Sequence, residues 1–483
     1  MNVSQEERKW LLVWLGIYAL GMFALASRKF YVMNSNTGDI AVVTQAFWNT
    51  LHGRFFYCVY VGMSHFGVHV TYAALQALPV YALIPSVYTL LFCQSLVIAA
   101  AGLPFYYIAR RILNDPRSAI LMTVAFLFYP TVATMHVDQL HWEHWSLLYL
   151  LGAVYFLLEE RFWPFAICSL LGMTGQENLP MTVGMFGVYA AIKRYRLKWI
   201  LTPIGLAVVY EWFALKIVLP HYMSGHAYAV THYFGTLGNT PGAMLQTAMI
   251  QPWKVLGPIF DLEHGTYLIK MLQPVLWIAP LFTWEFLLAV PSLGLNLIMP
   301  EASFRVIPWH YNPTSGAFLC LVAVFGVKRI AEIMVQRWGI GQGRLWLSFT
   351  IAVLSLSSWP LWFNLNEYIP HTYFPVLQKA AEVISPEKSV VAPVSMLGHF
   401  AERETPVHQW QFNPNNPFGG VWPREKLYEM DYIILDGNEH RFPDEIVTRD
   451  LVISFYTNTN YELILNNSNV FVFRRRASVS FTR

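Results

Sequence analysis

Acidic residues that could handle protons occur next to apolar runs in this chain. Asp39 stands near the start of NTGDIAVVTQAFWNTLHGRFF (residues 36–56), directly after the first apolar run. A carboxylate beside a bilayer is costly unless it is paired or used, so Asp39 could belong to a functional site. In a second interpretation, Asp39 only caps the helix that Thr37 and Gly38 begin. The residue types near Asp39 leave both interpretations open.

Two histidine-rich segments have a spacing that suits metal ligation. SHFGVH places His65 and His69 four residues apart, so a helix would align them on one face. In HVDQLHWEHW, a helix would align Asp138, His141 and His144, which are three residues apart. Imidazole and carboxylate groups are ligands for divalent cations. No compact motif such as H-E-x-x-H is present, so a hydrogen-bonded histidine network at the membrane surface is the alternative.

Two further acids, an arginine and a histidine complete the candidate set. Glu143 belongs to the same segment as the second histidine group, and TGQEN contributes Glu177. RVIPWHYN contributes Arg305 and His310. Charged groups beside a bilayer are costly unless they are paired or used. We therefore predict that these segments meet in one site.

The composition places this set in a membrane protein. Of the 483 residues, 55% are hydrophobic and 13% are charged, against about 25% charged in an average soluble domain. Long apolar runs recur and predict a multi-pass membrane protein. The net charge of +3 does not favour nucleic-acid binding. The four widely spaced cysteines predict neither a disulfide framework nor a cysteine metal site (Cys58, Cys93, Cys168, Cys320).

The apolar runs that could be membrane helices cover residues 10–27, 68–84, 87–109, 118–135, 145–159, 162–174, 179–192, 199–218, 268–283, 285–299, 314–330 and 345–363. The first run resembles a signal peptide, but we interpret it as the first transmembrane helix. Lys and Arg concentrate in short cytoplasmic loops of membrane proteins. They do so here only if residues 68–84 stay in the outer interface or re-enter it, with Arg28 and Lys29 as the exception. We therefore predict about 11 transmembrane helices, a cytoplasmic N-terminus and all histidines on the outer side or at its edge.

The composition changes near residue 365. The segments SVVAP, PVHQW, DYIILD, YELILNN and VFVFRRR are typical of short strands, with helical stretches between some of them. We therefore predict a transmembrane domain over residues 1–365. Residues 366–483 are expected to form a small α/β domain outside the membrane.

The same segments, in this order, resemble a known family. They are GDIAVVTQAFWNTLHGRFF, SHFGVH, LPVYALIPSVYTLLFCQSLVIAAAGLPFYYIARRIL, DQLHWEHW, QEN, IPWHYN and SVVAPVSMLGHFAERETPV with DYIILD. The chain resembles the domain of unknown function 2079 family of prokaryotic membrane proteins over nearly its whole length. That family is similar to the GT-C glycosyltransferases, which include protein O-mannosyltransferases, oligosaccharyltransferases and aminoarabinose transferases that use polyprenyl-phosphate sugars.

The resemblance implies a mainly α, GT-C-like membrane bundle. Its first outer loop carries an acidic catalytic residue and two juxtamembrane helices, which Asp39, helix 40–53 and segment 68–84 match. Asp138 or Glu143 would match the acid of the second outer loop. The family's carboxylate metal site is in doubt here because HVDQLHWEH is rich in histidine, so magnesium, manganese or zinc could be the divalent metal.

The resemblance also implies a function. A sugar would pass from a polyprenyl-phosphate donor to an unidentified acceptor on the outer face of the cytoplasmic membrane. The residues expected to serve are Asp39, Asp138 and Glu143 in catalysis, His65, His69, His141 and Glu177 in metal binding, and Arg305 and His310 in binding the donor phosphate. The expected partners are membrane lipid and further membrane proteins, and no nucleic acid.

Two other functions remain open. One is a non-catalytic membrane subunit or scaffold that keeps the GT-C-like fold. The other is a transporter of a lipid or small molecule, which would show charged residues at mid-membrane and an inverted repeat. Only Glu211 and Lys216 stand out within a run, and no repeat is visible.

Overall fold

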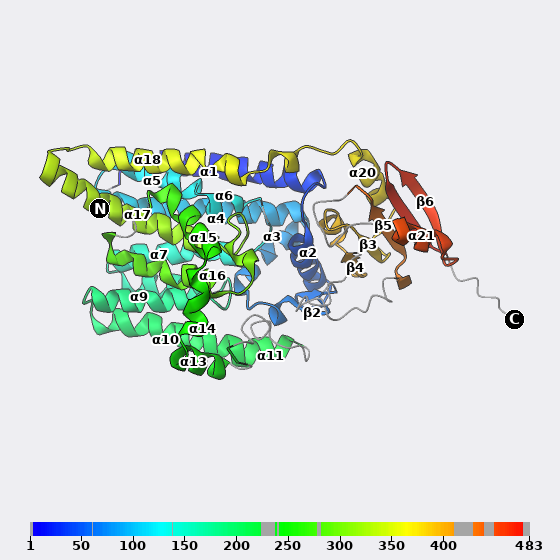
Figure 1. Ribbon diagram of the computed structural model, residues 1–483, viewed down its shortest axis with the longest axis horizontal. Helices are drawn as coiled ribbons and strands as arrows, with labels where there is room; N and C mark the ends of the chain where they lie inside the picture. The colour runs from blue at the N-terminus through cyan, green and yellow to red at the C-terminus, as the bar shows by residue number, and fades with distance from the viewer. Residues whose placement is uncertain are drawn as a thin grey trace.

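The computed structural model describes residues 3–59, 61–137, 139–223, 237–238, 241–277, 282–409, 428–438 and 449–476. Long helices lie side by side through most of the molecule, and a sheet forms the end that carries the C-terminus (Figure 1). Helix α2 runs across the direction of α1 and α4, between these two parts. The structure is therefore mainly helical with a small mixed sheet.

The α-helices of the helical part are α1 (Gln5–Tyr31), α2 (Gly38–Leu51), α3 (Leu78–Leu83), α4 (Val87–Leu113), α5 (Pro116–Leu127), α6 (Pro130–Thr134), α7 (Ser146–Leu158), α8 (Phe162–Met173), α9 (Pro180–Ile192), α10 (Leu197–Phe213), α11 (Leu219–Tyr222), α13 (Pro241–Ile250), α14 (Trp253–Leu256), α15 (Leu262–Leu272), α16 (Val290–Ile298), α17 (Pro313–Trp338), α18 (Gly343–Ser357) and α19 (Trp359–Trp362). Shorter elements are η1 (His65–Gly67), η2 (Tyr72–Gln76), η3 (Trp142–Trp145), η4 (Ala214–Val218), η5 (Gly257–Phe260), η6 (Gln273–Val275), η8 (Trp284–Leu288), η9 (Ala302–Arg305) and η10 (Leu365–Tyr368). Strands β1 (Tyr57–Cys58) and β2 (Met63–Ser64) form an antiparallel pair.

Three described helical segments are long and apolar enough to cross a membrane: Gln5–Tyr31, Val87–Leu113 and Leu197–Tyr222. Among the described residues, Pro116–Leu127, Phe162–Met173 and Pro180–Ile192 are shorter apolar helices. The number of about 11 transmembrane helices stays a prediction. Segment 68–84 forms only η2 and α3, and the six residues of α3 rise about 9 Å against a hydrocarbon core of about 30 Å. The prediction that this segment does not form a membrane-crossing helix is confirmed.

The predicted runs 268–283 and 285–299 do not form single long helices, so this part of the prediction is wrong. Helix α15 ends at Leu272, and Leu276 and Trp277 have left-handed φ angles of 56° and 43°. Helix α16 has 9 residues. Pro274 lies two residues after the end of α15 and cannot donate a backbone hydrogen bond, which favours the break.

Local sequence explains how α1 begins, whereas distant residues hold its far end. Ser4 accepts a hydrogen bond from the Glu7 backbone N–H, and two acids occupy the first turn, where they complement the helix dipole. In the last turn, Lys29 forms an ion pair of 2.7 Å with Glu367, and the Arg28 side chain donates to the Tyr368 carbonyl. The two basic residues that did not fit the charge pattern are thus bound by the segment that leads into the sheet.

The five predicted strands of the C-terminal part are all present. They are β3 (Val390–Ala392), β4 (Val407–Gln409), β5 (Tyr432–Asp436), β6 (Tyr461–Asn467) and β7 (Val470–Arg475), in the order β4-β3-β5-β7-β6. Strand β3 is parallel to β4 and β5, with Val390 opposite Val407 and Tyr432, whereas β7 is antiparallel to β5 and β6. Helices α20 (Phe374–Glu382) and α21 (Arg449–Thr457) and the turn η11 (Leu397–Phe400) complete this part.

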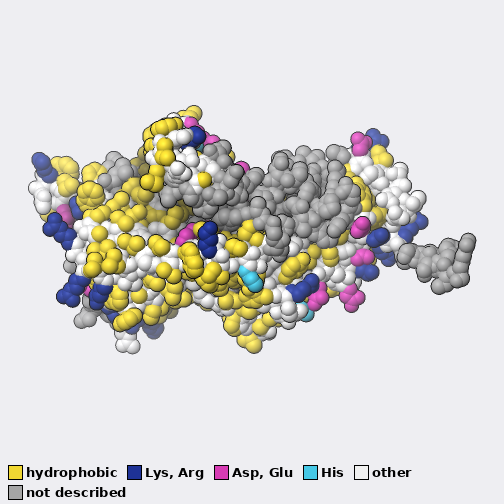
Figure 2. All heavy atoms as spheres, turned by 90° about the horizontal axis from the view of Figure 1, so that it is seen from below, with side chains coloured by type: hydrophobic (Ala, Val, Ile, Leu, Met, Phe, Trp, Pro, Cys, Tyr) yellow, Lys and Arg dark blue, Asp and Glu magenta, His cyan; other side chains and the backbone are white. Residues whose placement is uncertain are grey.

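The surface reflects this division. Apolar side chains cover much of the helical part in Figure 2, whereas Lys and Arg gather at the end opposite the sheet. Charges of both signs lie on the sheet part. An apolar band between two charged ends is the pattern that a bilayer imposes on a protein that spans it.

Candidate functional site

Helix α2 presents Asp39 in its first turn. Thr37 is the N-cap residue but makes no side-chain cap bond to its own helix, and the Asp39 backbone N–H donates to Gln139 Oε1 at 3.0 Å. The Asp39 side chain is 43% exposed, and its Oδ2 lies 3.2 Å from His141 Nε2. Its carboxylate therefore bonds to a second segment of the chain, which a mere helix cap would not do.

Asp39, His141 and His310 converge from three distant parts of the sequence. The rings of His141 and His310 stack with centroids 3.7 Å apart. Each of the three residues offers a ligand atom, and these atoms lie within 4.8 Å of one another, which makes the group able to hold a metal ion. The sequence prediction had assigned His141 to the metal but had placed His310 at the donor phosphate.

The charge state of this group favours an ionised acid beside a neutral imidazole. Partial loss of water around the 43% exposed side chain opposes ionisation of Asp39, but the hydrogen bond and the charge of His141 outweigh it and lower the pKa of Asp39 to about 2. Burial holds the pKa of His310 well below its ordinary value. A carboxylate and a neutral imidazole are the forms that bind a metal.

His69 and Glu177 form a second pair in the same region. Burial lowers the pKa of His69, but Glu177 outweighs it through charge and a hydrogen bond, so the pKa rises above 6.5. The two side chains meet at 2.9 Å, and Glu177 also accepts the Val70 backbone N–H at 2.9 Å. The His65 ring centroid is 6.3 Å from that of His69. Metal binding by His65, His69 and Glu177 stays a prediction.

Glu143 is a buried acid near both groups. Its side chain is 8% exposed, and its Oε1 lies 4.0 Å from His144 Nε2. Burial raises the pKa of Glu143 to about 7, against the opposing charges of His141 and His69. The helix that would align residues 138, 141 and 144 does not form in the described residues, because His141 is extended and η3 begins only at Trp142.

The contacts that the structure gives Arg305 are with residues outside these groups. Its guanidinium donates to Glu263 at 2.7 Å and to the Met299 carbonyl at 2.6 Å, and its side chain is 4% exposed. These hydrogen bonds tie Arg305 to the C-terminal end of α16. Little of its side chain is therefore accessible to a donor phosphate. Asp138, the other acid predicted for catalysis, lies outside the described residues.

Comparison with known proteins identifies the family of this chain. A family match spans residues 29–472. The chain belongs to the DUF2079 family of predicted membrane proteins. No curated protein matches its sequence at a significant level.

Solved structures show which fold this family member has. It is similar to ArnT from Cupriavidus metallidurans bound to undecaprenyl phosphate, with a TM-score of 0.54, 10% identity, and coverage of 97% of this chain and 98% of that one. The apo form of ArnT gives a TM-score of 0.52 at 11% identity, with coverage of 95% and 98%. The Archaeoglobus fulgidus oligosaccharyltransferase, in complex with Zn and sulfate, gives 0.40 at 13% identity, with coverage of 95% and 73%. The likeness to ArnT shows a GT-C-like fold.

Two glutamines that position the site were missed in the sequence. Gln94 of α4 is buried and donates to the carbonyls of Met135 and Gln139, while its oxygen accepts the His141 backbone N–H at 3.1 Å. Gln139 in turn holds Asp39. A polar amide inside an apolar helix was the available indication, because a buried amide must find partners.

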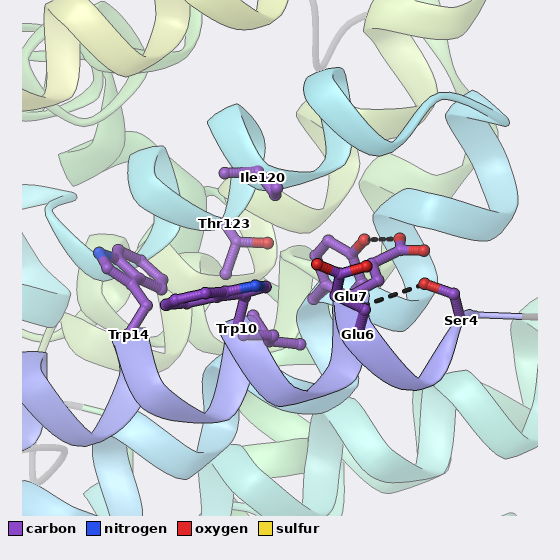
Figure 3. Close-up of a pocket in the computed structure, with 9 residues that line it drawn as sticks. Ser4, Glu6, Glu7, Trp10, Trp14, Ile120 and Thr123 are labelled. Atoms are coloured by element: carbon purple, nitrogen blue, oxygen red, sulfur yellow. Dashed lines mark hydrogen bonds between the residues drawn. The ribbon is translucent and has the colours of Figure 1, made fainter.

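A cavity of about 500 Å³ lies away from this site, near the beginning of α1. Figure 3 shows Trp10 and Trp14 along one side, Ile120 and Thr123 of α5 opposite, and the carboxylates of Glu6 and Glu7 at one end. Glu7 is bonded to Tyr106 and Arg110. None of the residues that line this cavity belongs to the group of Asp39, His141 and His310 or to the pair of His69 and Glu177.

Proposed function

We propose that the protein is a membrane glycosyltransferase that transfers a sugar from a polyprenyl-phosphate donor to an acceptor on the outer face. The observation that carries the proposal is the convergence of Asp39, His141 and His310 beside the sheet part. Two points support it. The fold is similar to that of ArnT, whose structure contains undecaprenyl phosphate. Under the predicted orientation, the acid lies on a helix of the first outer loop, where a GT-C enzyme would carry its catalytic acid.

Asp39 is proposed as the general base. The acceptor oxygen attacks C1 of the sugar, the bond between C1 and the phosphate oxygen breaks, and polyprenyl phosphate leaves with the electron pair. Asp39 takes the proton of the acceptor hydroxyl. Because the pKa of Asp39 is about 2, proton transfer becomes favourable only as the new C–O bond forms and the hydroxyl becomes strongly acidic.

The residues present fit a divalent cation. One carboxylate and two imidazoles form a ligand set that suits zinc or manganese better than magnesium, and three protein ligands leave a position open. Asp39, His141 and His310 would hold the ion. When bound, it would supply positive charge for the leaving phosphate. A ligand role for Asp39 competes with its role as base, so the second carboxylate oxygen would have to face the acceptor.

The membrane placement belongs to the same proposal. We place the N-terminus in the cytoplasm and the sheet part outside the cytoplasmic membrane. The support is the distribution of Lys and Arg along the chain and their gathering at the end opposite the sheet (Figure 2).

The test is release of undecaprenyl phosphate from a panel of undecaprenyl-phosphate sugars by purified protein, with metal analysis of the same samples. Asp39→Asn should lower release about 10²- to 10⁴-fold, the usual contribution of a general base. His141→Ala should lower the bound metal. Asp450→Asn is the matched control, since Asp450 is exposed on α21. Undiminished turnover in Asp39→Asn would rule out Asp39 as the general base. No turnover of any donor by the wild type would favour a non-catalytic subunit.

A further inference from the structure

The outer sheet part contacts the chain just before Asp39. The loop after β3 reaches the connection between α1 and α2, where Thr37 is fully buried. The Thr37 hydroxyl donates to the Val394 carbonyl at 2.7 Å and accepts the Gly398 backbone N–H at 2.9 Å. The Thr37 backbone N–H donates to the same Val394 carbonyl at 3.1 Å. Three hydrogen bonds thus join one residue to this loop.

Gly398 allows this close approach. A Cβ atom at Gly398 would lie 2.7 Å from Phe30 Cε2, 3.2 Å from Thr37 Cβ and 3.3 Å from Ile40 Cγ2. The neighbouring His399 ring stacks on Phe30 with centroids 4.1 Å apart, and its Nε2 lies 3.0 Å from the Phe30 carbonyl. The turn η11 therefore packs against the end of α1 and the beginning of α2 at once.

The use of the Thr37 hydroxyl is unusual for its place in the chain. An N-cap threonine ordinarily accepts a bond from a backbone N–H of its own helix. Thr37 makes no such bond, and its hydroxyl donates to a carbonyl of the β3–η11 loop instead. Gln139, which belongs to the helical part, accepts a hydrogen bond from the Asp39 backbone N–H. The first turn of α2 is therefore fixed from two directions.

We infer that the outer domain is part of the proposed active site, because its β3–η11 loop holds the first turn of α2 and so sets the position of the Asp39 carboxylate. Thr37 and Gly398 are positioning residues, which act through Asp39. The inference rests on the proposed function for its effect on catalysis. A catalytic group must be held within about 0.5 Å of its productive position, so a small movement of this turn suffices to lower the rate.

The experiment compares Thr37→Val, which removes the hydroxyl at nearly constant shape, with Thr37→Ser, which keeps it. Glu404→Gln is the matched control, because it disrupts the exposed contact between Arg54 and Glu404 beyond the far end of α2. Hydrogen exchange of the amides of residues 38–42 reports the position of the turn without any assay of activity. Release of undecaprenyl phosphate gives kcat and KM.

Thr37→Val should speed exchange of these amides at least tenfold and lower kcat about 10- to 100-fold with little change in KM. Thr37→Ser should restore both, and Glu404→Gln should leave both at the wild-type level. Unchanged exchange in Thr37→Val would overturn the inference even if no donor is turned over. Faster exchange with an unchanged kcat in an active enzyme would also overturn it. A loss of activity in Asp39→Asn with none in Thr37→Val would leave the proposed function standing without the positioning role.

Discussion

Individual side chains at the site fall into two groups with different charge arrangements. Asp39 meets two imidazoles, one of which burial keeps neutral, so this group can accept a cation. His69 meets a carboxylate that raises its pKa, so this pair forms a salt bridge of its own. The difference follows from which group each histidine contacts, and a sequence pattern of alternating His and acid residues does not contain that information.

The second group predicts a pH dependence of stability. The pKa of His69 is raised above 6.5 on folding, so its contribution is complete below 6.5 and is lost as the pH rises through the folded value. Burial opposes ionisation of Glu177, but His69 outweighs it and lowers the pKa of Glu177 below 4.5. The contribution of Glu177 is therefore complete above 4.5 and is lost as the pH falls through the folded value. The pair should stabilise the protein most between these two ordinary values.

Glu177→Gln tests this dependence while keeping an acceptor for the Val70 N–H. We expect the free energy of unfolding to fall by about 1 kcal/mol near pH 5.5, since His69 is one-third exposed, and to fall less near pH 8.5. Thermal unfolding of purified protein at the two pH values is the measurement. Glu387→Gln on the exposed surface should change neither. An equal loss at both pH values would mean that the two side chains are not an ion pair.

At the scale of helices and turns, two features position the residues of the site. They are buried amide side chains and helices that pack closely against neighbouring segments. Gln94 shows this, because one amide in α4 holds the segment from Met135 to His141 by three bonds. Gly316 of α17 allows close packing because it is small. A Cβ atom there would meet the side chains of Thr131 and Tyr129, which precede His141 in the sequence. Helix α17 begins directly after the His310 segment.

Gly316→Ala should therefore destabilise the protein. The new methyl group would lie 2.6 Å from Tyr129 Cε1, and overpacking of this kind costs about 1–3 kcal/mol. Gly294→Ala is the matched control, because Gly294 lies in helix α16 with open space around the added atom. It should leave stability unchanged or raise it by about 0.5–1 kcal/mol. Thermal unfolding in detergent separates the two, and equal melting temperatures would contradict the close packing at Gly316.

For the whole molecule, the charge distribution predicts an orientation. The sheet part should lie outside, and the end of α17 should lie in the cytoplasm. In a Cys168→Ser background, a membrane-impermeant maleimide should label Lys388→Cys in intact cells and Gln336→Cys only after permeabilisation. Both replaced positions are exposed, and the three other cysteines are buried. Labelling of Gln336→Cys in intact cells would reverse the orientation.

Periodicity and composition were sufficient for the elements whose stability is local. The five short strands after residue 365, the helix after Gly38 and the lack of a membrane-crossing helix at 68–84 were all predicted correctly. They follow from side-chain alternation, the helical spacing of apolar residues and run length, which neighbouring residues alone impose. Where a proline or a left-handed residue interrupts an apolar run, as after Leu272, hydrophobicity alone predicted too long a helix. The division of the chain at residue 365 stays a prediction.

The residue types of the site were visible in the chain, but their pairing was not. Asp39, His141 and His310 were each proposed from local motifs, yet the contact between them depends on how distant segments pack. Gln94, Gln139 and the Thr37 contact with the outer loop went unnoticed for the same reason. These hydrogen bonds join residues 45, 100 and 357 positions apart, and such bonds are set by the packing of whole helices and a sheet. Composition and spacing therefore determine the membrane class and the candidate residues, and three-dimensional packing determines which of them act together.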